Sequence, residues 1–154
     1  MKKFFGALVV VLICLSYSSS WAYLGMSLAE MKKKLGEPVK QVNAGTYLFE
    51  TKAKGSDRLL KINAGDTIKI EAVIKDDKVV KETVYVPNKL DTQKEFLNWV
   101  WAYSQGQIKN INSPKTKSIP TEAEKAYSFV GGVWAVPRTD PQDGTVAAIT
   151  IGKE

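Results

Sequence analysis

The chain has 154 residues, of which 44% are hydrophobic and 25% are charged, and its formal net charge at pH 7 is +6. This composition is that of an ordinary globular protein and excludes a disordered or fibrous chain. Histidine is absent and cysteine occurs once, which excludes Ser-His-Asp and Cys-His catalysis and almost every transition-metal site. We therefore expect a protein without catalytic residues, metal or cofactor.

The first 22 residues have the three parts of a secretory signal peptide. A basic start at Lys2 and Lys3 is followed by an apolar run over residues 4–15, which is short for a membrane span, and by a small polar stretch that ends at Ala22. Cleavage after Ala22 would leave a single domain, residues 23–154, with a net charge of +4, in the periplasm or outside the cell. The alternative is an uncleaved membrane anchor.

The single cysteine, Cys14, lies inside the predicted signal peptide. The exported domain would therefore have no disulfide, and its stability would come from an apolar core, which a domain of this size can supply. Ile13 precedes Cys14 at a position where bacterial lipoproteins place Gly, Ala or Ser. We expect no lipid attachment at Cys14.

A first helix is predicted over Leu28–Leu35. Ser27 can accept a hydrogen bond from the backbone N–H of Glu30 while the Glu30 carboxylate reaches back, which is a capping box, and Pro38 prevents the helix from continuing. The lysines at 32–34 favour a solvated face near the helix C-terminus, where cations complement the dipole. We expect no nucleic-acid partner, because these lysines are not interleaved with aromatic residues.

Strands are predicted next over Gln41–Lys52 and Arg58–Ile62, followed by a central hairpin over Thr67–Val86. Apolar and charged residues alternate along the hairpin, so one of its faces needs an apolar cover. For the turn we favour a three-residue loop, Lys75-Asp76-Asp77, over a two-residue one. The longer loop places Glu71 opposite Lys81 rather than opposite Glu82, and it turns Glu82 toward the covered face.

The first half of the chain also carries a family signature. It consists of Gly25-Met26-Ser27, then Leu35-Gly36-Glu37-Pro38 after an apolar helix, then an aromatic strand at Tyr47-Leu48-Phe49 and a hairpin with an aspartate turn. This pattern, over about Gly25–Val86, resembles the SmpA/OmlA (BamE-like) family of small bacterial envelope proteins, which is similar in fold to β-lactamase-inhibitory proteins. The resemblance implies a fold and a protein-binding role in assembly or enzyme inhibition, and no partner-binding residue can be carried over from it.

A second helix is predicted over Gln93–Gln105, where Thr92 and Glu95 again form a capping box. Its apolar residues spread over an arc about twice as wide as a surface helix needs. Burial on two sides explains this width. The sharper interpretation places Trp99 or Trp101 in a partner-binding surface, because tryptophan is enriched among binding hot spots.

The chain continues with a long polar stretch, Gln105–Pro120, that contains the lysines Lys109, Lys115 and Lys117. It is either a solvated linker or a basic loop that contacts an anionic membrane or polymer. A short helix is predicted after Thr121, and two apolar strands over Ser128–Val136 and Thr145–Ile151.

These elements predict an α+β domain with one antiparallel sheet of about five to six strands and two main helices packed on one face. A helix followed by a hairpin occurs in both halves, as in a tandem repeat. For function we expect a protein-binding module of the cell envelope, not an enzyme, with an envelope protein as its partner. The alternatives are a binder of anionic lipid or polymer and, third, a hydrolase that uses a carboxylate pair.

Overall fold

The structure is a computed structural model that describes residues 23–104, 115–118, 125–129 and 131–153. The predicted signal peptide, Lys109 and Thr121, after which a short helix is predicted, lie outside these residues. The described residues form two helices and eight strands. The elements are α1 (Leu28–Leu35), β1 (Lys40–Asn43), β2 (Thr46–Lys52), β3 (Thr67–Lys75), β4 (Lys78–Leu90), α2 (Gln93–Tyr103), β5 (Lys115–Ser118), β6 (Lys125–Ser128), β7 (Val133–Thr139) and β8 (Val146–Lys153).

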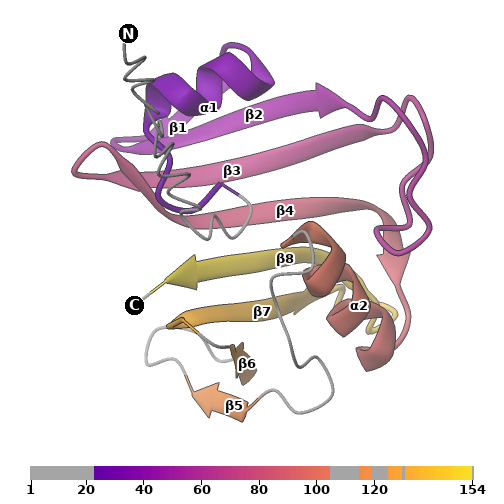
Figure 1. The fold of residues 1–154 in the computed structure, drawn as a ribbon. Helices are drawn as coiled ribbons and strands as arrows, with labels where there is room; N and C mark the ends of the chain where they lie inside the picture. The colour runs from indigo at the N-terminus through magenta and orange to yellow at the C-terminus, as the bar shows by residue number, and fades with distance from the viewer. Residues whose placement is uncertain (1–22, 105–114, 119–124, 130, 154) are drawn as a thin grey trace, which may run out of the picture.

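All eight strands belong to one sheet with the order β1-β2-β3-β4-β8-β7-β6-β5, and every neighbouring pair is antiparallel (Figure 1). Each half of the chain is one helix followed by a four-stranded meander. The last strands of the two meanders, β4 and β8, pair with each other at the centre of the sheet. The described structure is therefore a tandem arrangement of two like units around the β4–β8 seam.

The prediction of five to six strands under two main helices is wrong. The sheet has eight strands and dominates the fold, while the helices have only 8 and 11 residues. Two additional strands, β5 and β6, come from segments predicted as a loop and a short helix. They form because each pairs along its length with a neighbour, which their local sequences do not reveal.

Several predicted strands also have different limits. The predicted strand Gln41–Lys52 is two strands, β1 and β2, because the backbone at Gly45 turns with a φ of 78°. The segment Arg58–Ile62 makes only one isolated bridge, between Asp57 and Ile62. In contrast, β4 continues through Pro87 to Leu90, beyond the predicted end at Val86.

The central hairpin has a two-residue turn, so the predicted three-residue loop is wrong. Asp76 and Asp77 have φ values of 50° and 55°. Positive φ at both central residues is typical of a type I′ turn, whose twist matches that of the two flanking strands. A bulge between the Ile74–Val79 and Val73–Lys81 pairs then shifts the register by one residue. Glu71 therefore lies opposite Thr83, and Glu82 still faces the covered side, as predicted.

The first helix is confirmed at its predicted limits. The Ser27 hydroxyl accepts from the Glu30 N–H at 3.2 Å, and a Glu30 carboxylate oxygen accepts from the Ser27 N–H at 2.8 Å. The second helix also begins where predicted, with Thr92 accepting from the Glu95 N–H at 3.1 Å, but it ends two residues earlier.

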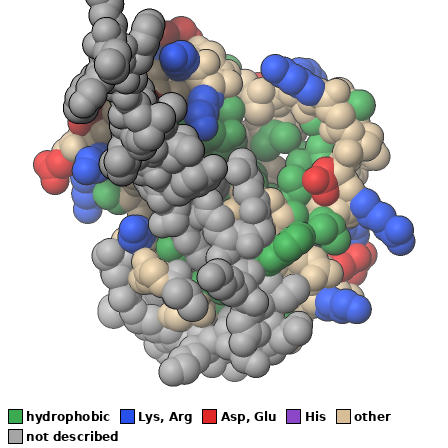
Figure 2. Space-filling view, viewed as in Figure 1, with side chains coloured by type: hydrophobic (Ala, Val, Ile, Leu, Met, Phe, Trp, Pro, Cys, Tyr) green, Lys and Arg blue, Asp and Glu red, His purple; other side chains and the backbone are tan. Residues whose placement is uncertain are grey.

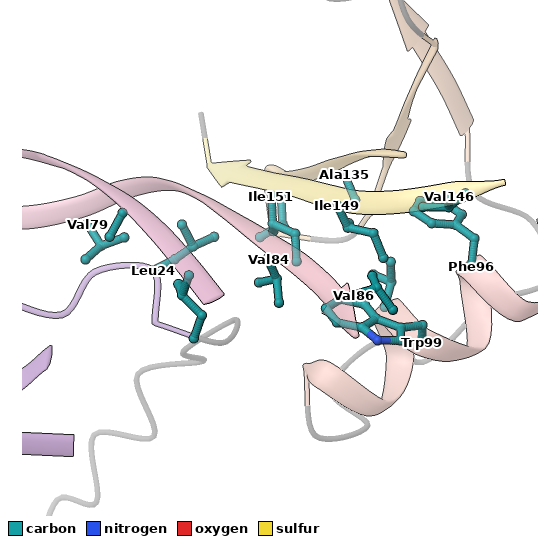
Figure 3. Close-up of a cluster of buried hydrophobic side chains, with 14 of the residues drawn as sticks. Leu24, Val79, Val84, Val86, Phe96, Trp99, Ala135, Val146, Ile149 and Ile151 are labelled. Atoms are coloured by element: carbon teal, nitrogen blue, oxygen red, sulfur yellow. The ribbon is translucent and has the colours of Figure 1, made fainter. Parts of the chain in front are cut away.

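One apolar core lies between the sheet and both helices. Met31 of α1 and Phe96 and Trp99 of α2 are buried in this core, which also contains strand residues such as Ile70 and Ile149. Figure 3 shows Phe96 and Trp99 reaching from α2 toward Val86, Val146 and Ile149. From the helix side, hydrophobic side chains gather near the middle of this face, with lysine and arginine side chains around its outline (Figure 2).

Candidate functional site

The sheet face turned away from the helices is the candidate site. Because side chains alternate along each strand, the neighbours of the core residues point to this second side. A groove of about 330 Å³ lies on it and crosses five strands of both halves. We call this the open-face groove, and its lining residues are Asn43, Thr46, Glu71, Val73, Lys81, Thr83, Tyr85 and Arg138.

The lining of the groove combines charges of both signs with one exposed aromatic ring. Glu71 is the acidic residue, Lys81 and Arg138 are the basic ones, and Tyr85 has 42% of its surface exposed. An ion pair between Lys69 and Glu50, at 3.2 Å, lies beside Tyr85 on the same side of the sheet. The surface is thus a polar one that offers paired donors and acceptors around an aromatic contact.

A hydrogen-bonded chain holds the floor of the groove across the central seam. The Arg138 Nε–H donates to the Thr150 hydroxyl at 2.7 Å, and the Thr150 and Thr83 hydroxyl oxygens are 2.9 Å apart. Thr150 is fully buried although it is polar, so these hydrogen bonds compensate for its burial. They fix the position of Arg138 relative to β4.

Trp134 of β7 lies on Gly152 of β8, its cross-strand partner. A Cβ atom added to Gly152 would overlap the six-membered ring of the Trp134 indole. Gly152 is therefore a position of close approach, where the absence of a side chain lets the indole lie on the backbone.

The two candidate tryptophans of α2 lie in different environments. Trp99 is 1% exposed, its ring stacks on Tyr103 with centroids 4.7 Å apart, and it belongs to the core, so it offers no surface to a partner. Trp101 is 37% exposed and remains available. Because α2 packs on the core side of the sheet, Trp101 and the open-face groove lie on opposite sides of the molecule.

The predicted basic loop is placed only in part. Lys115 and Lys117 belong to β5, the last strand at one edge of the sheet, and Lys109 lies outside the described residues. The structure therefore places Lys115 and Lys117 in an edge strand that contributes no residue to the lining of the groove.

A buried polar cluster lies in the core between Tyr23, Glu82 and Tyr103. The Glu82 side chain is completely buried, and its Oε2 has no hydrogen-bond partner among the described residues, nor do the buried Tyr103 hydroxyl and Trp99 Nε1. Burial raises the pKa of Glu82 to about 8, an effect that the long hydrogen bond from the Tyr23 N–H partly offsets. Burial and the negative charge of Glu82 raise the pKa of Tyr103.

Sequence reasoning missed the groove residues because they are scattered over five strands. The alternation of apolar and polar residues along the hairpin does predict that Glu71, Thr83 and Tyr85 lie on one side of it. Nothing local indicates that Arg138, more than 50 residues later, lies next to Thr83. That neighbourhood depends on the pairing of β4 with β8.

Within the described residues, no group of three or more Asp, Glu, Cys or His side chains is arranged to hold a metal ion. No helix in that part of the chain combines the length and the apolar character needed to cross a membrane.

Comparison with known proteins adds only distant structural likenesses. No protein-family model and no curated protein matches the sequence, so the SmpA/OmlA resemblance stays a prediction. A cysteine-rich secretory protein of Staphylococcus aureus matches with a TM-score of 0.45 and 11% identity over 86% of this chain. An extracellular protein with an SCP domain from Bacillus anthracis matches with a TM-score of 0.45 and 14% identity over 90% of it.

The chain spans 45% and 47% of the length of these two proteins. A DUF4309 family protein of Bacillus subtilis matches with a TM-score of 0.42 and 12% identity, over 83% of this chain and 78% of that one. Two of the three proteins are secreted or extracellular by name. At TM-scores below 0.5 these likenesses carry no argument about the function of this chain.

Proposed function

We propose that the chain is an exported, non-catalytic protein-binding module of the bacterial cell envelope, of the assembly or inhibitor type. The observation that carries the proposal is the open-face groove. It has a volume of about 330 Å³, a mostly polar lining, and residues from both halves of the sheet. Protein interfaces are enriched in tyrosine and arginine and use paired charges for specificity. Tyr85, Arg138, Lys81 and Glu71 supply these residue types on one face.

The rigidity of this face favours binding over catalysis. Its side chains stand on the strands of one continuous sheet, and Thr83 and Thr150 join the two central strands, β4 and β8, by hydrogen bonding. A preformed surface loses little conformational entropy when a partner binds. No histidine or thiol is available in the predicted mature chain to act as a nucleophile or base with its usual partners.

The test is an affinity pull-down from an envelope extract with the predicted mature protein, at low and high salt. We expect a specific protein partner that is retained at high salt and lost with Tyr85→Ala, because apolar contacts are screened by salt much less than ion pairs. Trp101→Ala is the matched control, since it removes a half-exposed aromatic residue from the opposite side of the molecule.

Each of the other outcomes has a distinct meaning. Loss of the partner with Trp101→Ala alone would move the binding surface to α2. Retention of only anionic lipid or polysaccharide, abolished by salt and by a Lys109/Lys115/Lys117→Ala triple variant, would replace the proposal with the anionic-polymer alternative. Export is tested separately, by mass spectrometry of the protein recovered outside the cytoplasm, which should begin at Tyr23.

A further inference from the structure

The Glu82 carboxylate lies beside the residue at which the predicted mature chain begins. The backbone nitrogen of Tyr23 is 3.5 Å from Glu82 Oε1, which is a long hydrogen bond. The second carboxylate oxygen, Oε2, has no partner among the described residues. A buried carboxylate without an opposite charge is costly, so this site is incompletely satisfied in the uncleaved chain.

The surroundings of Glu82 contain no cation in the described structure. Its cross-strand neighbours on the two adjacent strands are Ala72 and Ile151, both apolar. The titratable groups that face it are the hydroxyls of Tyr23 and Tyr103, which carry no positive charge. The adjacent Lys81 points to the opposite side of the sheet, into the open-face groove.

The chain is held firmly just after Tyr23. The Gly25 N–H donates to the Val79 carbonyl at 2.8 Å, and the Val79 N–H donates to the Met26 carbonyl at the same distance. Leu24 is buried in the core, and the Tyr23 ring meets the Tyr103 ring edge-on, with centroids 6.4 Å apart. These contacts fix the Tyr23 nitrogen next to Glu82 independently of what precedes it.

We propose that Glu82 is the binding site for the α-ammonium group that signal-peptide cleavage creates at Tyr23. The inference rests on the export proposed above. Hydrolysis of the Ala22–Tyr23 peptide bond consumes one water, leaves a carboxylate on Ala22 and releases the Tyr23 amine, which takes up a proton. One N–H is thereby replaced by three N–H donors and a positive charge.

The new donors match what the site lacks. Glu82 Oε2 and the Tyr103 hydroxyl are the two buried oxygen atoms without a partner in this part of the described structure. A cation at the Tyr23 nitrogen stabilises the ionised form of Glu82 much more strongly than the single, long amide hydrogen bond of the uncleaved chain does. Cleavage therefore converts Glu82 from a buried neutral acid into one member of a buried ion pair, and it completes the core of the exported protein.

The experiment compares four purified proteins. The first starts at Tyr23, exposed by proteolytic removal of a fusion partner, and the second keeps residues 18–22, which move the ammonium group away. Each is prepared with Glu82 and with Glu82→Gln. At pH 7, Glu82→Gln should lower the melting temperature of the protein that starts at Tyr23 by on the order of 10 °C, because it leaves a buried ammonium unpaired.

The same substitution should not lower the melting temperature of the extended protein, where it replaces a buried acid with a neutral amide. An equal loss in both backgrounds would overturn the proposal. If the Glu82→Gln protein does not fold, the reactivity of the α-amine in the wild-type protein still tests whether it pairs with Glu82. An amine-selective reagent should modify the α-amine at least tenfold more slowly in the native than in the unfolded state, and equal rates would overturn the pairing.

Failure of this inference is distinguishable from failure of the proposed function. A native protein that starts at a residue other than Tyr23 would contradict both the cleavage prediction and the proposal that processing creates the pair. It would not affect the pull-down with Tyr85→Ala. Loss of the predicted protein partner, in turn, would leave the comparison of the four proteins unchanged.

Discussion

The hydroxyl groups of Thr83 and Thr150 lie 2.9 Å apart across the seam that joins the two halves of the sheet. The two residues are direct cross-strand partners on β4 and β8. Arg138 extends the contact by donating to Thr150 at 2.7 Å. The floor of the proposed binding groove is thus formed by both halves of the chain and depends on their association.

The two threonines should contribute unequally to stability. Thr150 is fully buried and accepts from Arg138, so Thr150→Val removes two hydrogen bonds and should lower the free energy of unfolding by about 1–2 kcal/mol. Thr83 is half-buried, and Thr83→Val should cost less than about 1 kcal/mol because Thr150 keeps its bond to Arg138. Urea denaturation of both variants measures the difference, and a larger loss for Thr83→Val would contradict the assignment.

Gly152 should not tolerate a methyl group. Gly152→Ala drives its Cβ into the indole of Trp134, and overpacking of this kind costs about 1–3 kcal/mol. The control is the double variant with Trp134→Ala, in which the obstructing ring is absent. It should be no less stable than Trp134→Ala alone in thermal or urea unfolding. Additive losses would show that the close approach does not limit this position.

The two tryptophans of α2 should contribute unequally to stability. Trp99→Ala leaves a cavity in the core and should lower the free energy of unfolding by about 3–5 kcal/mol. Trp101→Ala should change it by less than about 1 kcal/mol, since that side chain is partly solvated. Chemical denaturation followed by circular dichroism avoids dependence on tryptophan fluorescence. Similar losses for both variants would contradict the burial described for α2.

The N-terminally extended protein should lose stability as pH rises. The pKa of Glu82 is about 8 in the folded chain against an ordinary value of 4.5, so the folded state holds one more proton than the unfolded state between these values. The free energy of unfolding is therefore highest below about pH 4.5 and falls as pH rises toward 8, by up to about 1.4 kcal/mol per pH unit from this group.

Glu82→Gln in the extended protein is the matched control, because it removes the titrating group and should flatten this part of the stability profile. The measurement is urea denaturation at several pH values between 4 and 9. A profile with the same slope in both proteins would assign the pH dependence to other groups.

Local sequence determined the features that depend on a few consecutive residues. Ser27 with Glu30 and Thr92 with Glu95 set the starts of the two helices, because a cap needs only residues within one turn. The alternation along Thr67–Val86 likewise determined that Ile70 and Glu82 share the covered side. The lack of histidine excluded whole classes of chemistry without any structure.

Only the tertiary structure decided what depends on partners distant in sequence. The four-residue segments Lys115–Ser118 and Lys125–Ser128 are strands because they pair with each other and the second also pairs with β7. The bulge after Val79 sets the register of β3 against β4, which the length of the turn alone did not predict correctly. The juxtaposition of Thr83 with Thr150 follows from β4 pairing with β8, 67 residues apart. Such contacts are selected by the burial of the whole sheet, and no local pattern specifies which strands become neighbours.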